Sequence, residues 1–540
     1  MTANILSRFG YKVVVFEQHY TAGGSTHVYK AKDFDFDVGV HYIGGQLDRW
    51  NSVFRRIFDW LSDGKLEWSS MNTVFDVAYN NKTGERLSFV GNRKENRDTL
   101  LRHFKSLKPT SLDMYYHKCQ KARFVAYMAF AMKLLPPMAT KICWKLGFGQ
   151  LYKHYCLNTT WDVMKSCELP DEVIGALTYS WGDYGTPPSK SPFFAHAFME
   201  SHYEGGAFFP KGGSSSIGKT LIASLRRRGG EVFSCSPVDK ILTESSKYGG
   251  YKAMGVIVKG VKIRAKNGII SNAGFAKTFE ISGKSLPLVD SIAGAHQLAL
   301  VHHKEVTPPL SPSPAFFDLF VGLDGTDNEL GLLGQNIWHL VDWNHDVNLK
   351  NLLSAENMTA TKCLETPLVF LSNESAKDPT FSNRHPGKST VTMITWTNSE
   401  WFDQYRHTLH GKRGRSYDEM KKSLTSKLLE VLYFHFPKTK GHVIFTDLGT
   451  PLSANKFLGR ISGEIYNLDL TEERFKTVSS HLALHPQTTI QNLYLTGQDV
   501  VAVSIEGATL SGCFTASRVS AIVLFFMIPI TLFLIPWVVW

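Results

Sequence analysis

Two apolar stretches open the chain and differ in their periodicity. Residues 1–10 place apolar side chains on one face of a helix, and residues 11–16, Tyr-Lys-Val-Val-Val-Phe, have the composition of a strand that ends at Glu17. Helix, strand and then an acidic residue is the order of the second half of a Rossmann βαβ unit. Three later segments also have strand composition: 231–235, 251–258 and 493–496. The pattern predicts an α/β protein.

The segments that suit a nucleotide-binding domain are separated by long stretches rich in helices, aromatic residues and loops. We therefore predict a Rossmann-like domain built from dispersed segments, with an inserted α+β domain for the substrate. The predicted parts are 1–45, 205–280 and 486–520 for the nucleotide-binding domain, 46–204 and 281–485 for the inserted domain, and 521–540 for an apolar C-terminal tail.

A Rossmann unit normally begins with a strand and a glycine-rich turn that places a pyrophosphate at a helix N-terminus. The sequence starts at the helix that follows this turn. We therefore expect the missing half-unit in a longer form of the protein. An incomplete, inactive version of an enzyme stays open as an alternative.

Two segments have the composition of membrane-contacting chain. Residues 519–540 are apolar apart from Ser520, Thr531 and two prolines, which is long enough to cross a bilayer, although a buried terminal helix is the alternative. Residues 123–155 mix aromatic and aliphatic side chains with lysines. This mixture is typical of helices in a membrane interface, and equally of a helical hairpin that covers an apolar tunnel.

Composition narrows the class of partner. Hydrophobic residues make up 43% of the chain and charged residues 20%, which is typical of an ordered globular protein. The formal net charge of +11 favours anionic partners, and because the basic residues are scattered, a membrane surface or an anionic cofactor is expected rather than nucleic acid. The seven cysteines show neither metal-ligand spacing nor a disulfide framework, so no metal site is predicted.

Candidate cofactor-binding residues follow the first strand. A carboxylate at the position of Glu17 can accept hydrogen bonds from both hydroxyls of a ribose. The pair Gly23-Gly24 lets the backbone approach a flat cofactor without a Cβ clash. Taken alone, Glu17 is as well explained as a solvated strand end, but its spacing from these glycines and from Gly39 favours a binding role.

A second group of candidates follows the last strand. Asp499, in Gly497-Gln-Asp, lies where an acidic side chain can bind a hydroxyl of a ribityl chain, and an N-terminal helix cap is the alternative. Glu506-Gly-Ala508 opens the next helix, whose N-terminus can bind a polar edge or an anion.

Taken in order, these motifs resemble the phytoene desaturase and carotenoid isomerase family of FAD-dependent flavoproteins. The resemblance covers about residues 1–518, with the inserted domain matching more loosely. The motifs that carry it are Glu17…Ala22-Gly-Gly24, Asp37-Val-Gly-Val-His-Tyr-Ile-Gly44, Tyr203-x-Gly-Gly-x-x-x-Pro-x-Gly-Gly213, Ile270-Ser-Asn-Ala273 and Leu495-Thr-Gly-Gln-Asp499.

The resemblance implies a role for each matching residue. Glu17 would hold the adenosine ribose, Gly23 and Gly24 would pass the pyrophosphate and flavin, and Gly39 would face the flavin ring. Val238 would contact adenine through its backbone. The remaining residues, which would lie at the crossover and at the ribityl and flavin edge, are Asn272, Gly497, Asp499 and Ala508.

The resemblance also implies an activity. Within the family, the segments around Glu17, Val40–Gly44 and Tyr494–Val500 are most similar to enzymes that saturate one double bond of a retinoid. FAD would carry the hydride, NAD or NADP would be the electron donor, and the endoplasmic reticulum membrane the location. His41 and Tyr42 are the catalytic candidates because they follow Gly39, and structural roles for both residues are the alternative. A polyene isomerase or desaturase is the alternative activity.

Overall fold

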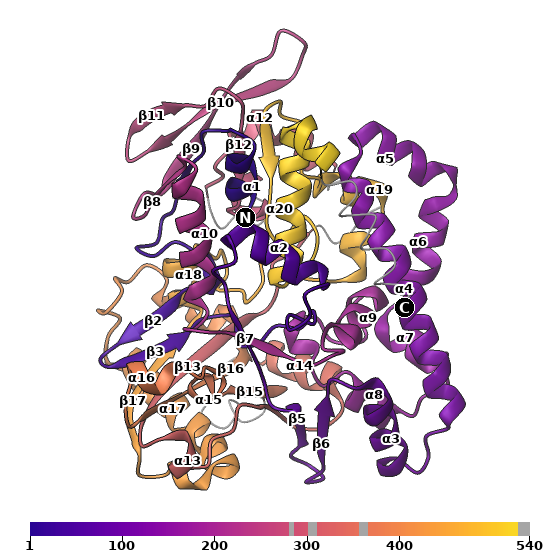
Figure 1. Ribbon diagram of the computed structural model, residues 1–540, viewed down its shortest axis with the longest axis vertical. Coiled ribbons are helices and arrows are strands. Elements are labelled where there is room, and N and C mark those ends of the chain that lie inside the picture. The colour runs from indigo at the N-terminus through magenta and orange to yellow at the C-terminus, as the bar shows by residue number, and fades with distance from the viewer. Residues whose placement is uncertain (280–285, 301–309, 356–365, 527–540) are drawn as a thin grey trace.

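The computed structural model describes residues 1–279, 286–300, 310–355 and 366–526 (Figure 1). The helix and strand predicted at the start are present as α1 (Thr2–Arg8) and β1 (Val14–Phe16). β1 pairs in parallel with β8 (Glu231–Phe233), and β12 (Ile269–Ser271) pairs in parallel with β18 (Leu493–Leu495). These parallel pairs, formed by segments far apart in the sequence, are the Rossmann-like part of the fold.

Two helices and a three-stranded meander complete this part. Asn4 of α1 donates from Nδ2 to the carbonyl oxygen of Leu221 in α10 (Ser215–Arg227) over 2.9 Å. On its other side, α1 lies so close to α20 (Ile505–Val519) that a Cβ on Gly512 would sit 3.1 Å from the Met1 side chain. The meander consists of β9 (Val238–Ser245), β10 (Tyr251–Val258) and β11 (Val261–Arg264).

A seven-stranded mixed sheet forms the second large element, and all of its strands come from residues within 46–204 and 281–485. Its strand order is β17-β13-β16-β15-β14-β5-β6, with β5 and β14 parallel and the other neighbours antiparallel. The strands are β5 (Val74–Asn80), β6 (Arg86–Val90), β13 (Ala315–Asp324), β14 (Asn336–Leu340), β15 (Leu368–Ser372), β16 (Lys388–Thr397) and β17 (Val443–Gly449).

The two faces of this sheet are buried by different partners. Alternate residues of β13, such as Leu319 and Val321, pack with Leu428 and Leu432 of α17 (Arg415–His435). On the opposite face Phe320 packs against Phe34 and Phe36 of the hairpin β2 (Val28–Ala31) and β3 (Phe34–Asp37). The hairpin joins the nucleotide-binding segments to the sheet.

A helical layer covers one side of the molecule, at the right of Figure 1. Its central helix, α4, packs against α6 and α9. The layer comprises α3 (Arg93–His103), α4 (Pro109–Ala131), α5 (Pro137–Cys143), α6 (Gly149–Cys156), α7 (Thr160–Lys165), α8 (Asp171–Leu177) and α9 (Phe193–His202). Smaller elements are α2 (Val53–Ser62), β4 (Trp68–Ser70), β7 (Phe208–Pro210), α11 (Phe275–Phe279), α12 (Ser291–Ala299), α13 (Asp327–Leu330), α14 (His345–Leu353), α15 (Glu374–Lys377), α16 (Phe381–Arg384), α18 (Pro451–Leu458) and α19 (Val478–Ala483).

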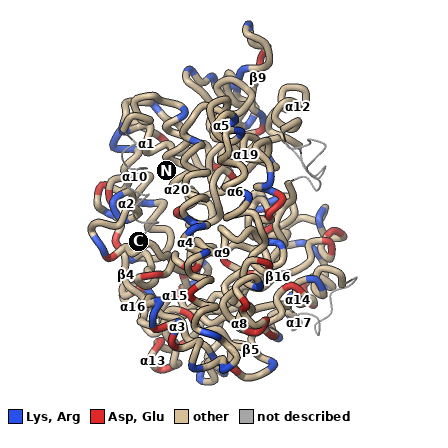
Figure 2. Tube along the Cα trace, turned by 90° about the vertical axis from the view of Figure 1, so that its right-hand side faces the viewer, with Lys and Arg blue, Asp and Glu red and all other residues tan. Residues whose placement is uncertain are grey.

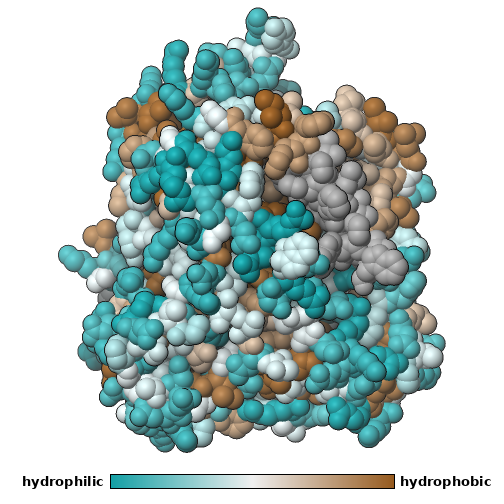
Figure 3. Space-filling model, in the orientation of Figure 1, coloured by the Kyte–Doolittle hydropathy of each residue, from teal (hydrophilic) through white to brown (hydrophobic). Residues whose placement is uncertain are grey.

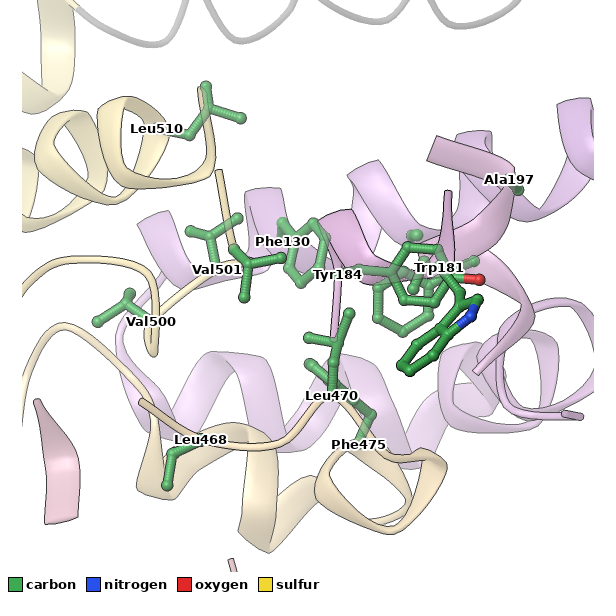
Figure 4. Packing of buried hydrophobic residues seen from close by; sticks show 14 of the residues in the cluster. Phe130, Trp181, Tyr184, Ala197, Leu468, Leu470, Phe475, Val500, Val501 and Leu510 are labelled. Atoms are coloured by element: carbon green, nitrogen blue, oxygen red, sulfur yellow. The ribbon is translucent and has the colours of Figure 1, made fainter. Parts of the chain in front are cut away.

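One continuous hydrophobic core joins this layer to the C-terminal segments. Phe130 of α4 lies beside Val501 and faces Leu470 and Phe475, which precede the last strand (Figure 4). Trp181 and Tyr184 extend the same core toward the sheet. The helical layer and the nucleotide-binding segments therefore share buried surface.

Figure 2 shows basic and acidic residues interspersed along the chain trace. Within the described ranges, every helix is too short or too polar to cross a bilayer. Of the predicted apolar segment 519–540, residues 527–540 lie outside the described part of the chain.

The shared core gives a stability prediction. Phe130 is 2% exposed, so Phe130→Ala should leave a cavity that costs about 3–5 kcal/mol and should move the urea unfolding midpoint to a lower concentration. Phe525→Ala, at a side chain that is 82% exposed, is the matched control and should leave the midpoint nearly unchanged. Equal midpoints for the two variants would mean that Phe130 does not join the two parts.

Candidate functional site

Glu17 lies where β1 meets the turn into β9. Its backbone N–H donates to the carbonyl oxygen of Phe233 over 2.9 Å, and its own carbonyl oxygen accepts from Ser236 N–H over 2.7 Å. Its side-chain Oε1 accepts from the backbone N–H of His19 over 2.8 Å. The structure therefore brings Glu17 next to the turn that leads to Val238, which is the arrangement expected for the adenosine end of a cofactor.

The glycine loop lies against the first turn of α10. Gly23 and Gly24 have φ values of +135° and +57°, which disfavour any residue with a Cβ. A Cβ on Gly218 of α10 would sit 3.6 Å from Gly23 Cα, and one on Gly39 would meet the Ser25 side chain at 3.0 Å. The predicted residues Gly23 and Gly39 are thus closely packed, whereas a Cβ on Gly24 would meet open space.

A second group gathers after the last strand. Gly497 has φ +97°, and a Cβ there would sit 2.2 Å from Asn272 Oδ1. Oδ2 of Asp499 accepts from the backbone N–H of Phe275 over 2.8 Å. Its Oδ1 is buried without a hydrogen-bond partner in the described part of the chain. Asn272, Gly497 and Asp499 therefore lie together, and Oδ1 of Asp499 can accept a hydrogen bond from a ligand.

The first turn of α20 presents two further unpartnered oxygens. Ser504 caps the helix by accepting from Gly507 N–H over 3.0 Å, and Ala508 N–H donates to the Ser504 carbonyl oxygen over 3.1 Å. Glu506 is 5% exposed, and neither carboxylate oxygen has a hydrogen bond within the described ranges. His202 Nε2 lies 3.5 Å from Glu506 Oε1, but this nitrogen accepts from Gly44 N–H and so has no proton to donate to Glu506.

The unpartnered oxygens of Asp499 and Glu506 bear on whether this site suits a flavin nucleotide. Buried polar atoms are normally hydrogen-bonded, so Asp499 Oδ1 and the two Glu506 oxygens need donors. The hydroxyls of a ribityl chain and the N–H of a flavin ring are donors of that kind. The residues present fit the cofactor, while the role of each single residue stays a prediction.

The catalytic candidates His41 and Tyr42 lie in a buried polar network. His41 Nδ1 is 3.1 Å from Glu374 Oε1, and its Nε2 is buried without a partner among the described residues. The Tyr42 hydroxyl lies 3.1 Å from Asp76 Oδ2 and 2.8 Å from Asp183 Oδ2. Tyr42 also stacks on Tyr203, with ring centroids 4.5 Å apart and planes 8° apart.

Sequence reasoning missed the carboxyl groups and the lysine of this network. Asp76 interrupts an apolar strand and is fully buried, which is the one local signal that points to it. Lys377 Nζ is also buried and donates to His41 O over 3.0 Å, to Ser372 Oγ over 2.6 Å and to Asn336 Oδ1. No local pattern marks Lys377, because it lies in the short helix α15 and its partners come from a loop and from two strands of the sheet.

Burial shifts the pKa values in this region. It raises the pKa of Asp76 to about 6 and that of Asp37, whose Oδ1 accepts from Ser214 N–H over 2.8 Å, to about 7. Loss of solvent, with Asp76 nearby, raises the pKa of Asp183 well above its usual value. Burial lowers the pKa of Lys377 to about 8. Burial therefore shifts these carboxyl groups toward the neutral form compared with carboxyl groups in water.

A cavity of about 70 Å³ adjoins the network. It meets the network at Tyr179 and Tyr203, and its remaining wall is mainly aromatic and aliphatic, with an ion pair between Arg93 and Glu200. Other residues of the wall are Phe75, Phe89, Leu100, Tyr115, Tyr116, His196 and Met199. Pockets for drug-sized ligands measure ~300–1,000 Å³. This cavity is smaller, so it holds only one end of a polyene, and a longer part enters only if side chains move apart.

Comparison with known proteins defines the class. The family of flavin containing amine oxidoreductases matches residues 1–265. An oxidoreductase from Methanosarcina mazei shares the fold with a TM-score of 0.56 at 16% identity, with 95% of each chain covered. The predicted α/β fold class is thus confirmed, and residues 1–265 match a family of flavin-containing oxidoreductases, which supports the predicted FAD cofactor.

Sequence relatives define the family more closely. The all-trans-retinol 13,14-reductase of Danio rerio is 31% identical over 527 residues, covering 96% of this chain and 83% of that protein. A chloroplastic prolycopene isomerase of Daucus carota is 25% identical over 96% of this chain and 78% of that protein. The chain belongs to the family of the all-trans-retinol 13,14-reductases. The predicted resemblance is confirmed.

The Gly497 contact gives a prediction for cofactor retention. Gly497→Ala should displace Asn272 and lower the amount of flavin that copurifies, because the new Cβ would overlap Asn272 Oδ1. Gly411→Ala is the matched control: its φ of +79° costs a similar ~1–3 kcal/mol of backbone strain, but no atom lies within 4 Å of the new Cβ. Flavin per protein, measured by absorbance, should fall only in the first variant. Equal flavin contents in the two variants would show that Gly497 does not contribute to cofactor binding.

Proposed function

We propose that this protein saturates one C=C bond of a retinoid, converting all-trans-retinol to 13,14-dihydroretinol. The observation that carries the proposal is the 31% identity to the Danio rerio reductase across 96% of the chain. The aromatic cavity beside Tyr203 supports it, because an apolar polyene gains free energy when it is transferred from water to such a wall.

The chain's own residues supply binding and orientation. Glu17 and the turn to Val238 hold the adenosine end of the FAD, the backbone of Gly23, Gly24 and Gly39 lies along it, and Asp499 holds the ribityl chain. Bound FAD supplies hydride transfer. NADH or NADPH is the proposed electron donor that makes repeated reduction possible.

Product mass distinguishes reduction from isomerisation. Anaerobic protein with its flavin reduced, mixed with all-trans-retinol, should yield a product two hydrogens heavier than the substrate. Each product molecule should be matched by one flavin reoxidised, because the reaction consumes one hydride. Mass spectrometry and flavin absorbance measure the two quantities. A product of unchanged mass, formed without flavin reoxidation, would establish the polyene isomerase instead.

We also propose that the surface of residues 137–156, which comprises α5, the π-helical turn Trp144–Phe148 and α6, contacts the endoplasmic reticulum membrane, from which the retinoid enters. Met138, Ile142 and Leu146 are exposed by 68%, 52% and 83%, although apolar side chains of this size are usually buried. Hydrophobic side chains gather at the upper right of Figure 3, where Figure 1 places α5 and α6.

Charge favours a bilayer as the occupant of this surface. Lys141, Lys145 and Lys153 are exposed beside the apolar side chains, and residues 132–156 contain no Asp or Glu. Lysines near an anionic leaflet contribute ~1 kcal/mol each. Apolar side chains flanked by lysines match the interface of a bilayer that carries anionic lipids.

Vesicle sedimentation tests this surface. Leu146→Glu should reduce binding to phosphatidylserine-containing vesicles several-fold, because it places a negative charge at the apolar contact. Leu409→Glu makes the same change at a side chain that is 73% exposed elsewhere, and should bind as the unmodified protein does. Unchanged sedimentation of Leu146→Glu would exclude this surface from the membrane contact.

A further inference from the structure

Two carboxyl groups share one phenol at the end of the aromatic cavity. The Tyr42 hydroxyl lies 2.8 Å from Asp183 Oδ2 and 3.1 Å from Asp76 Oδ2. A phenol carries one hydrogen, so it can donate to only one of the two carboxyl groups. The other contact is a hydrogen bond only if that carboxyl group is protonated and donates to the phenol oxygen.

Three other side chains donate hydrogen bonds to the carboxyl groups of Asp76 and Asp183. Tyr179 donates to Asp76 Oδ2 over 2.9 Å, Asn336 donates to Asp76 Oδ1 over 2.8 Å, and Tyr203 donates to Asp183 Oδ2 over 3.5 Å. With the two Tyr42 contacts this makes five contacts, for which the three phenols and one N–H of the Asn336 amide supply four hydrogens. One further proton completes the network, and without it two oxygen atoms repel each other.

Charges on the neighbouring elements favour that proton. Lys377 is the cation of the network and also faces Asp37 and Glu374, so one positive charge is surrounded by four acidic side chains. Burying several anions around one cation is costly, and protonation of a carboxyl group removes part of that cost. The raised pKa values of Asp76 and Asp183 follow from the same burial.

The remaining polar groups that face Asp76, Tyr42 and Asp183 do not replace the missing hydrogen. Trp338 faces Asp76 as a further donor, but its N–H on the carboxyl group places no hydrogen between the two oxygens of a Tyr42 contact. Tyr466 donates its hydroxyl to the backbone oxygen of Asp183 over 2.7 Å, which leaves the carboxyl group unaffected. Glu506 faces Tyr203 and adds negative charge. His41 pairs with Glu374 rather than with Asp76 or Asp183.

Two tyrosines connect Asp76, Tyr42 and Asp183 to the cavity. Tyr179 and Tyr203 belong to the cavity wall and to the hydrogen-bond network at the same time. His196, 2% exposed, belongs to the same wall, and its Nδ1 has no partner in the described part of the chain, so it can form a hydrogen bond with a ligand in the cavity. Asp183 is less buried than Asp76, which is fully buried, so Asp183 is the acid of the pair that exchanges its proton with water.

We propose that Asp76, Tyr42 and Asp183 together hold one exchangeable proton and deliver it to the substrate in the cavity through the hydroxyls of Tyr179 and Tyr203. This inference rests on the proposed reduction of a C=C bond. The π bond breaks as one carbon receives hydride from reduced flavin and its neighbour receives the proton from a tyrosine hydroxyl. That tyrosine regains a proton from the carboxyl group, which becomes a carboxylate and is protonated again by water.

Infrared spectroscopy tests the stored proton without any turnover. At neutral pH the full-length holoprotein should show the carbonyl band of a protonated carboxyl group that Asp183→Asn removes. Asp76→Asn should remove it too, because the amide of either asparagine supplies the missing hydrogen to Tyr42 and the remaining carboxyl group ionises. Asp113→Asn, at an exposed acid, should remove only carboxylate bands. Loss of carboxylate bands alone in all three variants would overturn the inference.

Single-turnover kinetics test the delivery. Reoxidation of prereduced flavin by all-trans-retinol should be fast at low pH and should slow as pH rises through the pKa of the unit that Asp76, Tyr42 and Asp183 form, because the proton-loaded form reacts. Asp183→Asn should slow reoxidation by about 10²-fold or more, as for loss of a general acid, and should flatten the pH profile. Tyr179→Phe/Tyr203→Phe should slow reoxidation while the infrared band of the protonated carboxyl group stays.

The possible failures are distinguishable. If unmodified protein with reduced flavin does not react with all-trans-retinol, the proposed function fails, and the infrared result still decides whether the proton is stored. If the unmodified protein reacts and Asp183→Asn keeps both its rate and its pH profile, the delivery fails while the proposed function stands. Should Asp183→Asn not retain flavin, an infrared pH titration of the unmodified protein decides: absence of a titrating protonated carboxyl group overturns the inference.

Discussion

The hydrogen bonds of Tyr42 connect three parts of the molecule, and the rest of the structure depends on this connection. Tyr42 belongs to the loop that follows Gly39, Asp76 to the seven-stranded sheet and Asp183 to the helical layer. In this low-dielectric junction, each polar group depends on its partner, because an unpartnered one would carry a large desolvation penalty. The relative position of cofactor segments, sheet and cavity is therefore fixed by polar contacts as well as by the shared core.

The sequence predicted the local elements well and the long-range ones poorly. The strand predicted at 251–258 is β10 (Tyr251–Val258), and the strand predicted at 493–496 is β18 (Leu493–Leu495), because turn residues and apolar runs mark both. The seven-stranded sheet was not predicted, since most of its strands are buried on both faces and lack alternation. Glu17 and Gly497 carry local motifs, whereas Asp183 and Lys377 acquire their partners only through folding.

The fold and the site have different relatives. The Methanosarcina mazei oxidoreductase shares the arrangement of elements at 16% identity, which carries no information on substrate. The carrot isomerase and the zebrafish reductase both match 96% of this chain, although their names describe different reactions on polyenes. Similarity along the whole chain therefore does not separate reduction from isomerisation.

The parallel pair of β5 and β14 has a consequence for how the protein is made. The hydrogen bond between Asn336 and Asp76 joins residues 260 positions apart, and Figure 1 shows the purple β5 and β6 beside strands of much later sequence. During synthesis, the β5–β6 hairpin therefore has an unpaired strand edge, and Asp76 lacks its partner Asn336, until β14 has left the ribosome. Folding of this sheet is a late event of high contact order, and nascent chains that stop earlier expose an aggregation-prone edge.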